Sequence, residues 1–185
     1  MKIALIVGHE KKSKGAFSKT LGQAEYDWNT ELANMARNYA TMIGAEVQIF
    51  FRDVVGIAGA YKKALAWKPD ALIELHFNAA DGKASGTETL YNDAGDAKDV
   101  HEVIFAKKVN DAMVKALGLK DRGIKKRQPG DRGYGNINQT KSVPSILIES
   151  GFGDNPKDAK AMAANKNKLA KALINGTVDF LKEFV

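Results

Sequence analysis

Residues 3–9 read Ile-Ala-Leu-Ile-Val-Gly-His, and this stretch sets the pattern for the chain. A short, continuous apolar run that ends at a glycine is typical of a strand buried in a parallel sheet. Comparable runs recur at residues 46–51, 71–76 and 144–149. Apolar residues at helical spacing separate several of these runs. Strands that alternate with helices predict an α/β fold with a mostly parallel central sheet.

No internal repeat or linker interrupts this alternation. We therefore expect residues 1–185 to form a single domain, with helices on both faces of the sheet as in phosphorylase- and hydrolase-like folds. Asp27 is the expected N-cap of the first helix, and Gly44 its expected end. The other expected elements are helices at 28–43 and 54–67, a strand at 86–91, a helix at 105–116, a basic loop at 119–142 and a closing helix at 169–184.

The composition excludes several classes of protein. With 44% hydrophobic and 27% charged residues, the chain has the profile of a globular domain, not that of a disordered or coiled-coil protein. It contains no cysteine, which excludes a disulfide framework, a thiolate metal site and a cysteine nucleophile. Any metal must be held by carboxylates or by some of the three histidines. The net charge of +6 favours an anionic partner.

Titratable side chains follow or close three of the expected strands. His9 lies two residues after the first strand, His76 closes the third and Glu149 closes the last. Ligands of open α/β sheets bind outside the carboxyl ends of the strands. We therefore expect these side chains to meet at one edge of the sheet.

Two imidazoles and a carboxylate form the donor set of a catalytic zinc site with three protein ligands and an open position. Glu25 is the best third ligand, because it stands where the first helix begins, at the edge where the first strand ends. Glu10 is a rival, but side chains adjacent in sequence rarely converge on one ion. Glu74, two residues before His76 on the same face of its strand, is a second rival. We interpret it as a partner of the ligands or a residue of the rim.

Six blocks of sequence carry a resemblance: GHEKKSKGA, Glu25 within GQAEYDWNTELA, ELHFNA, GTETLY, DRGIKK and ILIESGFGDNPKDA. Together they resemble the zinc-dependent N-acetylmuramoyl-L-alanine amidases of type 3, and most closely the catalytic domains of bacteriophage endolysins. The resemblance runs from about Lys2 to Phe184. Many members of this family carry Asp-Pro before Gly-His and glycines after it, whereas this chain has Ile6-Val7 and Glu10-Lys11 there.

The resemblance implies a peptidoglycan hydrolase with one Zn²⁺ per chain. It assigns His9, Glu25 and His76 as zinc ligands and Glu149 as the catalytic glutamate. The bond cut would be the amide between N-acetylmuramic acid and the L-alanine of the stem peptide. Zinc-activated water would be the nucleophile and Glu149 the general base and acid. The spacing of the residues alone supports only a metallohydrolase with a separate glutamate base.

A basic stretch precedes the strand that carries Glu149. Residues 120–132 hold six Lys or Arg and two Asp, a net charge of 6 − 2 = +4. Such a stretch suits a groove wall for anionic stem peptides, although a solvated face is an equal alternative. The expected substrate-binding residues are Asn78, Lys125, Lys126, Arg127 and Tyr134.

Two other functions remain open on the sequence. The first is a zinc carboxypeptidase-like peptidase, which is disfavoured because Lys12 stands where its His-x-x-Glu pattern needs a glutamate. The second is a non-catalytic peptidoglycan-binding module, which the intact set of four site residues disfavours. Nucleic acid is not an expected partner, because no helix carries a stripe of Lys and Arg.

The expected localisation follows from the same sequence. The apolar run near the N-terminus is too short for a signal peptide, and no window approaches the ~20 apolar residues of a membrane span. A phage or prophage lysin would wait in the host cytoplasm until a membrane pore released it to the wall. We expect a monomer without a separate wall-binding domain.

Overall fold

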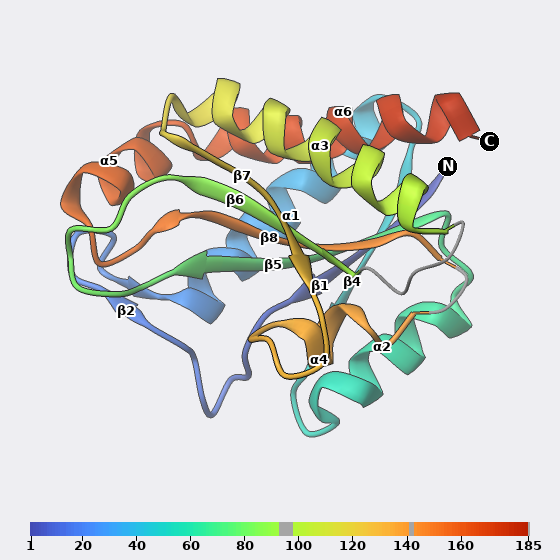
Figure 1. Ribbon diagram of the computed structural model, residues 1–185, viewed down its shortest axis with the longest axis horizontal. Coiled ribbons are helices and arrows are strands. Elements are labelled where there is room, and N and C mark those ends of the chain that lie inside the picture. Colours follow the sequence, from blue (N-terminus) through green and yellow to red (C-terminus); the bar gives the residue numbers. More distant parts are fainter. Residues whose placement is uncertain (93–97, 141–142, 185) are drawn as a thin grey trace.

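The computed structural model describes residues 1–92, 98–140 and 143–184. Its centre is a six-stranded sheet in the order β4-β1-β5-β8-β6-β7 (Figure 1). Strands β4, β1, β5 and β8 are parallel, whereas β6 runs antiparallel to β8 and β7 runs parallel to β6. The prediction of a mostly parallel sheet is confirmed. The strands are β1 (Lys2–Val7), β4 (Glu46–Phe51), β5 (Ala71–Asn78), β6 (Thr87–Asn92), β7 (Asp121–Arg127) and β8 (Ser145–Phe152), with a small ribbon of β2 (Phe17–Ser18) and β3 (Gln23–Ala24) beside the sheet.

The two faces of the sheet are covered to different extents (Figure 1). Three long helices, α1, α3 and α6, pack on one side, which we call the covered face. The shorter helices α2 and α4 contact the opposite side, which we call the site face. The helices are α1 (Glu25–Met42), α2 (Gly56–Ala66), α3 (Lys98–Leu117), α4 (Tyr134–Ile137), α5 (Pro156–Ala164) and α6 (Lys166–Phe184).

Side-chain alternation along each strand separates the residues of the two faces. On β8, Ile146 and Ile148 are fully buried in the main core with α1, α3 and α6. Leu147, between them, points to the site face and packs against Ile137 of α4. Glu149 follows on that same face. The covered face therefore holds the main core, and the site face is free to carry polar groups.

Several expected boundaries are wrong in detail. Helix α1 begins at Glu25 after Ala24, which makes no side-chain cap, so Asp27 lies in the first turn and is not the N-cap. Helix α3 begins at Lys98, earlier than its apolar spacing indicated. The expected loop 119–142 contains β7 and α4, while residues 141 and 142 lie outside the described ranges. Strand β7 is an edge strand, which has only one neighbour to pair with. Its polar sequence contains no apolar run from which a strand could be predicted.

Helix α5 was not expected, although its start carries a recognisable signal. The side chain of Asn155 accepts hydrogen bonds from the backbone N–H groups of Lys157 and Asp158, and Pro156 occupies the first turn. The helix is only nine residues long, too short to display a convincing apolar stripe. In the described parts of the chain, no helix is long and apolar enough to cross a membrane.

Candidate metal centre

Three expected ligands converge on one point of the structure. His9 follows β1, Glu25 is the first residue of α1 and His76 lies on β5. One oxygen of Glu25 is 3.0 Å from Nε2 of His9, and the other is 2.8 Å from Nδ1 of His76. One potential ligand atom from each of the three residues lies within 4.8 Å of the other two.

Close backbone approach makes this convergence possible. A Cβ at Gly8 would lie 2.3 Å from the ring of His76, so only glycine leaves room for that imidazole. Gly15 has φ +75°, and a Cβ there would lie 2.6 Å from both Glu25 Oε2 and the ring of His9. His9 itself adopts a φ of 65°, which is uncommon for a residue with a side chain and is often found at functional sites. The loop after β1 is thus shaped around the ligand cluster.

The carboxylate of Glu25 is held ionised between the two imidazoles. Burial acts to raise its pKa, but hydrogen bonds and positive charge from His76 and His9 outweigh this and lower the pKa to about 2. Burial acts to lower the pKa of His76, yet its bonds to Glu25 and Glu74 raise that pKa to about 10. Metal binding must therefore displace a proton from His76, because a histidine ligand binds in its neutral form.

The donor set fits zinc. Two imidazole nitrogens and one carboxylate oxygen are the ligands of a catalytic His₂Glu site, which keeps a further position open for water or substrate. His9 retains 28% of its side-chain exposure, so the cluster is accessible from the site face. Glu10 is not part of this cluster, and its backbone pairs instead with Ser13.

Glu74 contacts the cluster through His76. Its carboxylate is fully buried and lies 3.2 Å from Nε2 of His76, the nitrogen that Glu25 does not engage. Arg52 forms an ion pair with it at 3.1 Å, Tyr61 donates a hydrogen bond of 2.7 Å and Asn136 donates one of 2.8 Å. Such partners fix the orientation of a ligating histidine. Glu74 thus contacts His76, and its role as a partner of metal ligands stays a prediction.

Glu149 stands beside His76 across the junction of β5 and β8, in direct register. The residue is only 8% exposed, and its Oε2 atom has no hydrogen-bond partner. Burial, together with the charges of Glu25 and Glu88, raises its pKa to about 8 against the opposing charges of His76 and Arg132. A carboxyl group with such a pKa can gain and lose a proton near neutral pH. The alternative role that the sequence offers for Glu149 is an ion pair with Lys141, a residue outside the described ranges.

The site differs from expectation in where it lies on the strands. We expected His76 and Glu149 to close their strands, but β5 continues to Asn78 and β8 to Phe152. Both residues therefore point from the interior of a strand onto the site face. Because β6 is antiparallel, Glu88 also joins this face, in register with Glu149.

A cavity of about 210 Å³ opens from the cluster along the site face. Of the expected substrate-binding residues, Asn78 and Arg127 line this cavity, whereas Lys125, Lys126 and Tyr134 do not. The amide of Asn78 donates a 2.9 Å hydrogen bond to Glu88. The lining consists of His9, Arg52, His76, Asn78, Glu88, Leu90, Arg127, Arg132, Gly133, Asn136, Leu147 and Glu149.

Sequence reasoning missed several of these lining residues. Arg52 directly follows β4, so the same strand-end argument that found His9 could have found it. Glu88 carried no such signal, because its place beside Glu149 depends on the antiparallel pairing of β6 with β8. Arg132 and Asn136 reach the site only through the turn and short helix that follow β7.

The sequence profile of the family described as N-acetylmuramoyl-L-alanine amidase matches residues 3–178. Among curated proteins, an uncharacterized cell wall amidase of Bacillus anthracis is 32% identical over 121 residues, which make up 61% of this chain and 21% of that protein. The N-acetylmuramoyl-L-alanine amidase CwlM of Bacillus licheniformis is 24% identical over 181 residues, or 95% of this chain and 67% of that protein. The chain thus spans about a fifth of the first relative.

Solved structures share the fold. An N-acetylmuramoyl-L-alanine amidase of Clostridium difficile 630 superposes with a TM-score of 0.85 at 22% identity, covering 100% of this chain and 98% of that chain. The catalytic domain of an endolysin that targets Clostridia difficile gives a TM-score of 0.74 at 26% identity, with 97% of each chain covered.

Proposed function

Because the chain belongs to the N-acetylmuramoyl-L-alanine amidase family, we propose that it hydrolyses the amide between N-acetylmuramic acid and the L-alanine of the stem peptide in peptidoglycan. One observation carries the proposal. Glu149, buried and without a partner at Oε2, lies in register with His76 at the mouth of the His9–Glu25–His76 cluster. A proton-transfer group beside a metal-binding cluster is the arrangement that metal-assisted amide hydrolysis needs.

His9, Glu25 and His76 would hold a single Zn²⁺. When bound, the ion would lower the pKa of a water molecule and polarise the carbonyl of the scissile amide. Glu25 would contribute the anionic ligand. Glu74 would accept the remaining N–H of His76 and so keep Nδ1 free for the metal.

Glu149 would move the proton. Its Oε2 atom would accept a proton as a water oxygen bonds to the lactyl carbonyl carbon. It would return that proton to the nitrogen of L-alanine as the carbon–nitrogen bond breaks. The products are a lactyl carboxylate and a stem peptide with a free amino group. The raised pKa of Glu149 supports this double role, because general acid–base groups work best near the operating pH.

The remaining expected residues would contact the substrate. The side-chain carbonyl oxygen of Asn78 would accept a hydrogen bond from the stem peptide, since its side-chain nitrogen donates to Glu88. Arg127 would bind the substrate within the cavity. Lys125, Lys126 and Tyr134 do not line the cavity and would contact the anionic polymer outside it. The likeness to an endolysin catalytic domain supports a role in lysing the host wall after release through a membrane pore.

The proposal is tested on purified protein with isolated cell walls. We expect one zinc per chain, loss of wall turbidity and release of peptides with N-terminal L-alanine, without new reducing ends. Glu149→Gln should keep the zinc and lose about 10²–10⁴-fold in rate. Release of C-terminal residues of the stem peptide would indicate the carboxypeptidase-like peptidase instead. Wall binding without any product would indicate a binding module.

A further inference from the structure

The cavity beside the metal centre is lined by three arginines that differ in their pairing. Arg52 is committed to the buried Glu74, with its Nη1 atom 3.1 Å from Oε1. Glu88, which also lines the cavity, is already paired with Arg122 at 2.8 Å. Among the residues that the structure describes, Arg127 and Arg132 have no ion pair, and Nε of Arg127 is buried without a hydrogen-bond partner.

The fold brings these two arginines together from separate segments. Arg127 ends β7 in register with Asn92, and it therefore shares the site face with Leu90, two residues earlier on β6. After β7 the chain turns back, with the N–H of Asp131 bonded to the carbonyl of Gln128 at 3.0 Å. Arg132 follows this turn and lines the same cavity.

A glycine lets the turn approach the sheet. Gly133 has φ +89°, and a Cβ there would lie 3.0 Å from a methyl carbon of Leu90. The backbone can therefore approach β6 closely and hold Arg132 near the candidate metal centre. The positive charge of Arg132 acts on Glu149, although the two do not form an ion pair.

Unpaired guanidinium groups in a cavity call for an anionic partner. Burying an N–H donor without an acceptor is unfavourable, and a ligand oxygen would relieve that cost for Arg127. The planar guanidinium matches a carboxylate with two parallel hydrogen bonds, which a lysine ammonium cannot reproduce. The glycan side of the scissile bond offers neutral hydroxyl and acetamido groups, whereas carboxylates belong to the stem peptide.

We propose that Arg127 and Arg132 form a subsite for a free carboxylate of the stem peptide, on the residues that follow L-alanine. The inference rests on the proposed function and adds a preference to it. A stem peptide can carry this group as the α-carboxylate of its D-glutamyl residue, which some walls amidate, or as a carboxylate of the diamino acid after it. The enzyme would distinguish walls by whether these groups are free.

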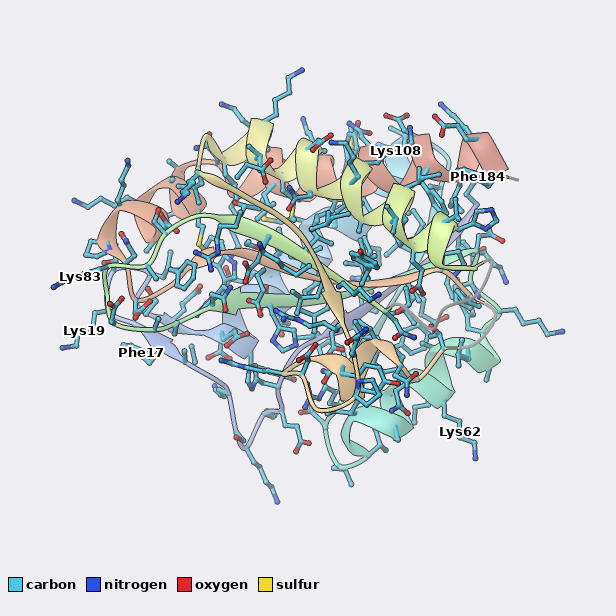
Figure 2. All side chains as sticks on the ribbon, in the orientation of Figure 1. Phe17, Lys19, Lys62, Lys83, Lys108 and Phe184 are labelled. Carbon is cyan, nitrogen blue, oxygen red and sulfur yellow. The ribbon has the colours of Figure 1, made fainter. Side chains whose placement is uncertain are left out.

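The test uses three synthetic substrates. The first is N-acetylmuramoyl-L-alanyl-D-glutamine, in which only the α-carboxylate is free, and the second is the amidated dipeptide, in which both carboxyls of the D-glutamyl residue are amides. The third is the D-isoglutamine form extended through its γ-carboxyl by meso-diaminopimelate, in which only the diamino acid carries carboxylates. Each is assayed with the parent, with R127Q/R132Q and with K62Q/K63Q. The last pair removes the same charge from two exposed residues of α2, and Figure 2 shows Lys62 projecting outward from that helix. Thermal unfolding checks that every variant is folded.

We expect the parent to prefer a carboxylate-bearing substrate by about 10- to 100-fold in kcat/KM, mostly through KM. Whichever of the two carboxylate-bearing substrates is preferred tells which carboxylate is bound. R127Q/R132Q should lose the preference, so that its kcat/KM is the same for free and amidated substrates, while K62Q/K63Q should retain the preference of the parent. R127K should fall between the two, because it keeps the charge without the planar fork.

Binding to Glu149→Gln, measured by calorimetry with the same substrates, separates this inference from the proposed function. If no substrate is cleaved by the parent but the carboxylate preference appears in binding and disappears with R127Q/R132Q, the subsite stands and the amidase reaction does not. Equal affinity for free and amidated peptides, or a preference that survives R127Q/R132Q, would overturn the subsite.

Discussion

The two faces of the central sheet are built from the same strands but bury different kinds of side chain. On β5, Ile73 and Leu75 point into the covered face and are fully buried among apolar helices. Glu74 and His76, which alternate with them, point to the site face and are buried among polar partners. Adjacent positions along a single strand thus serve stability and chemistry separately.

The energetic consequences differ as well. Burying each large apolar side chain of the covered face contributes about 1.5–3 kcal/mol to folding. On the site face, each buried charge must be compensated by partners, and the pairing gives geometry more than net stability. We therefore expect substitutions on the covered face to lower stability and leave zinc binding intact. Substitutions on the site face should have effects that depend on which partner is lost.

The largest expected effect comes from Glu25→Gln. The amide has nearly the same shape, but it lacks the charge and the second acceptor that hold His9 and His76. Zinc affinity, measured by competition with a chelator, should fall by more than the about 10- to 100-fold that loss of an outer partner of a ligand costs. Wall hydrolysis should disappear with it. The ligand set is wrong if this variant keeps all of its zinc at the chelator concentration that removes half of the zinc from the parent.

Arg52→Met should produce the next largest effect, on stability. It leaves His76, among the described residues, as the one remaining cationic partner of the buried carboxylate of Glu74, and breaking a buried pair costs up to about 3–5 kcal/mol. The free energy of unfolding from urea titration measures the loss. The double variant R52M/E74Q is the matched control, because it removes the charge as well and should recover much of the stability. A double variant as unstable as R52M would show that shape, not the buried charge, is responsible.

Ile148→Ala probes the covered face next to the proposed catalytic residue. Removing this buried side chain should lower the free energy of unfolding by about 2–5 kcal/mol. Zinc content and hydrolysis per folded molecule should remain close to those of the parent. A selective loss of activity at temperatures where the variant stays folded would contradict the separation of the two faces, since Glu149 is the next residue in sequence.

The smallest expected effect concerns the basic strand outside the cavity. K125Q/K126Q should slow wall hydrolysis at low salt by an amount equivalent to about 1 kcal/mol or less, because Lys126 is exposed, Lys125 is half-buried, and charges that water reaches act weakly. The difference from the parent should vanish as salt shortens the screening length to about 3 Å near 1 M. Turbidity loss across a salt series measures this. A defect that persists unchanged at high salt would mean that these lysines make direct contacts.

The sheet could be predicted from the sequence because the pattern that indicates a buried strand is local. Continuous apolar runs predict buried strands wherever they occur, and strand ends of a parallel sheet meet at one edge. This reasoning brought His9, His76 and Glu149 to one site, and the structure places all three around a common cavity. Edge strand β7, with the sequence DRGIKKR, has no such run, and its pairing with β6 could not be foreseen from its own residues.

What the sequence determined by itself is the class of fold, the family and the donor types available for a metal, because these depend on composition, periodicity and motif order. Tertiary structure alone decided that the site lies on a face of the sheet and not beyond its ends. It also decided that Glu88 adjoins Glu149 and that Arg127 and Arg132 line one cavity. The physical reason is that these contacts depend on the direction and register of β6 and β7, which arise from pairing between segments distant along the chain.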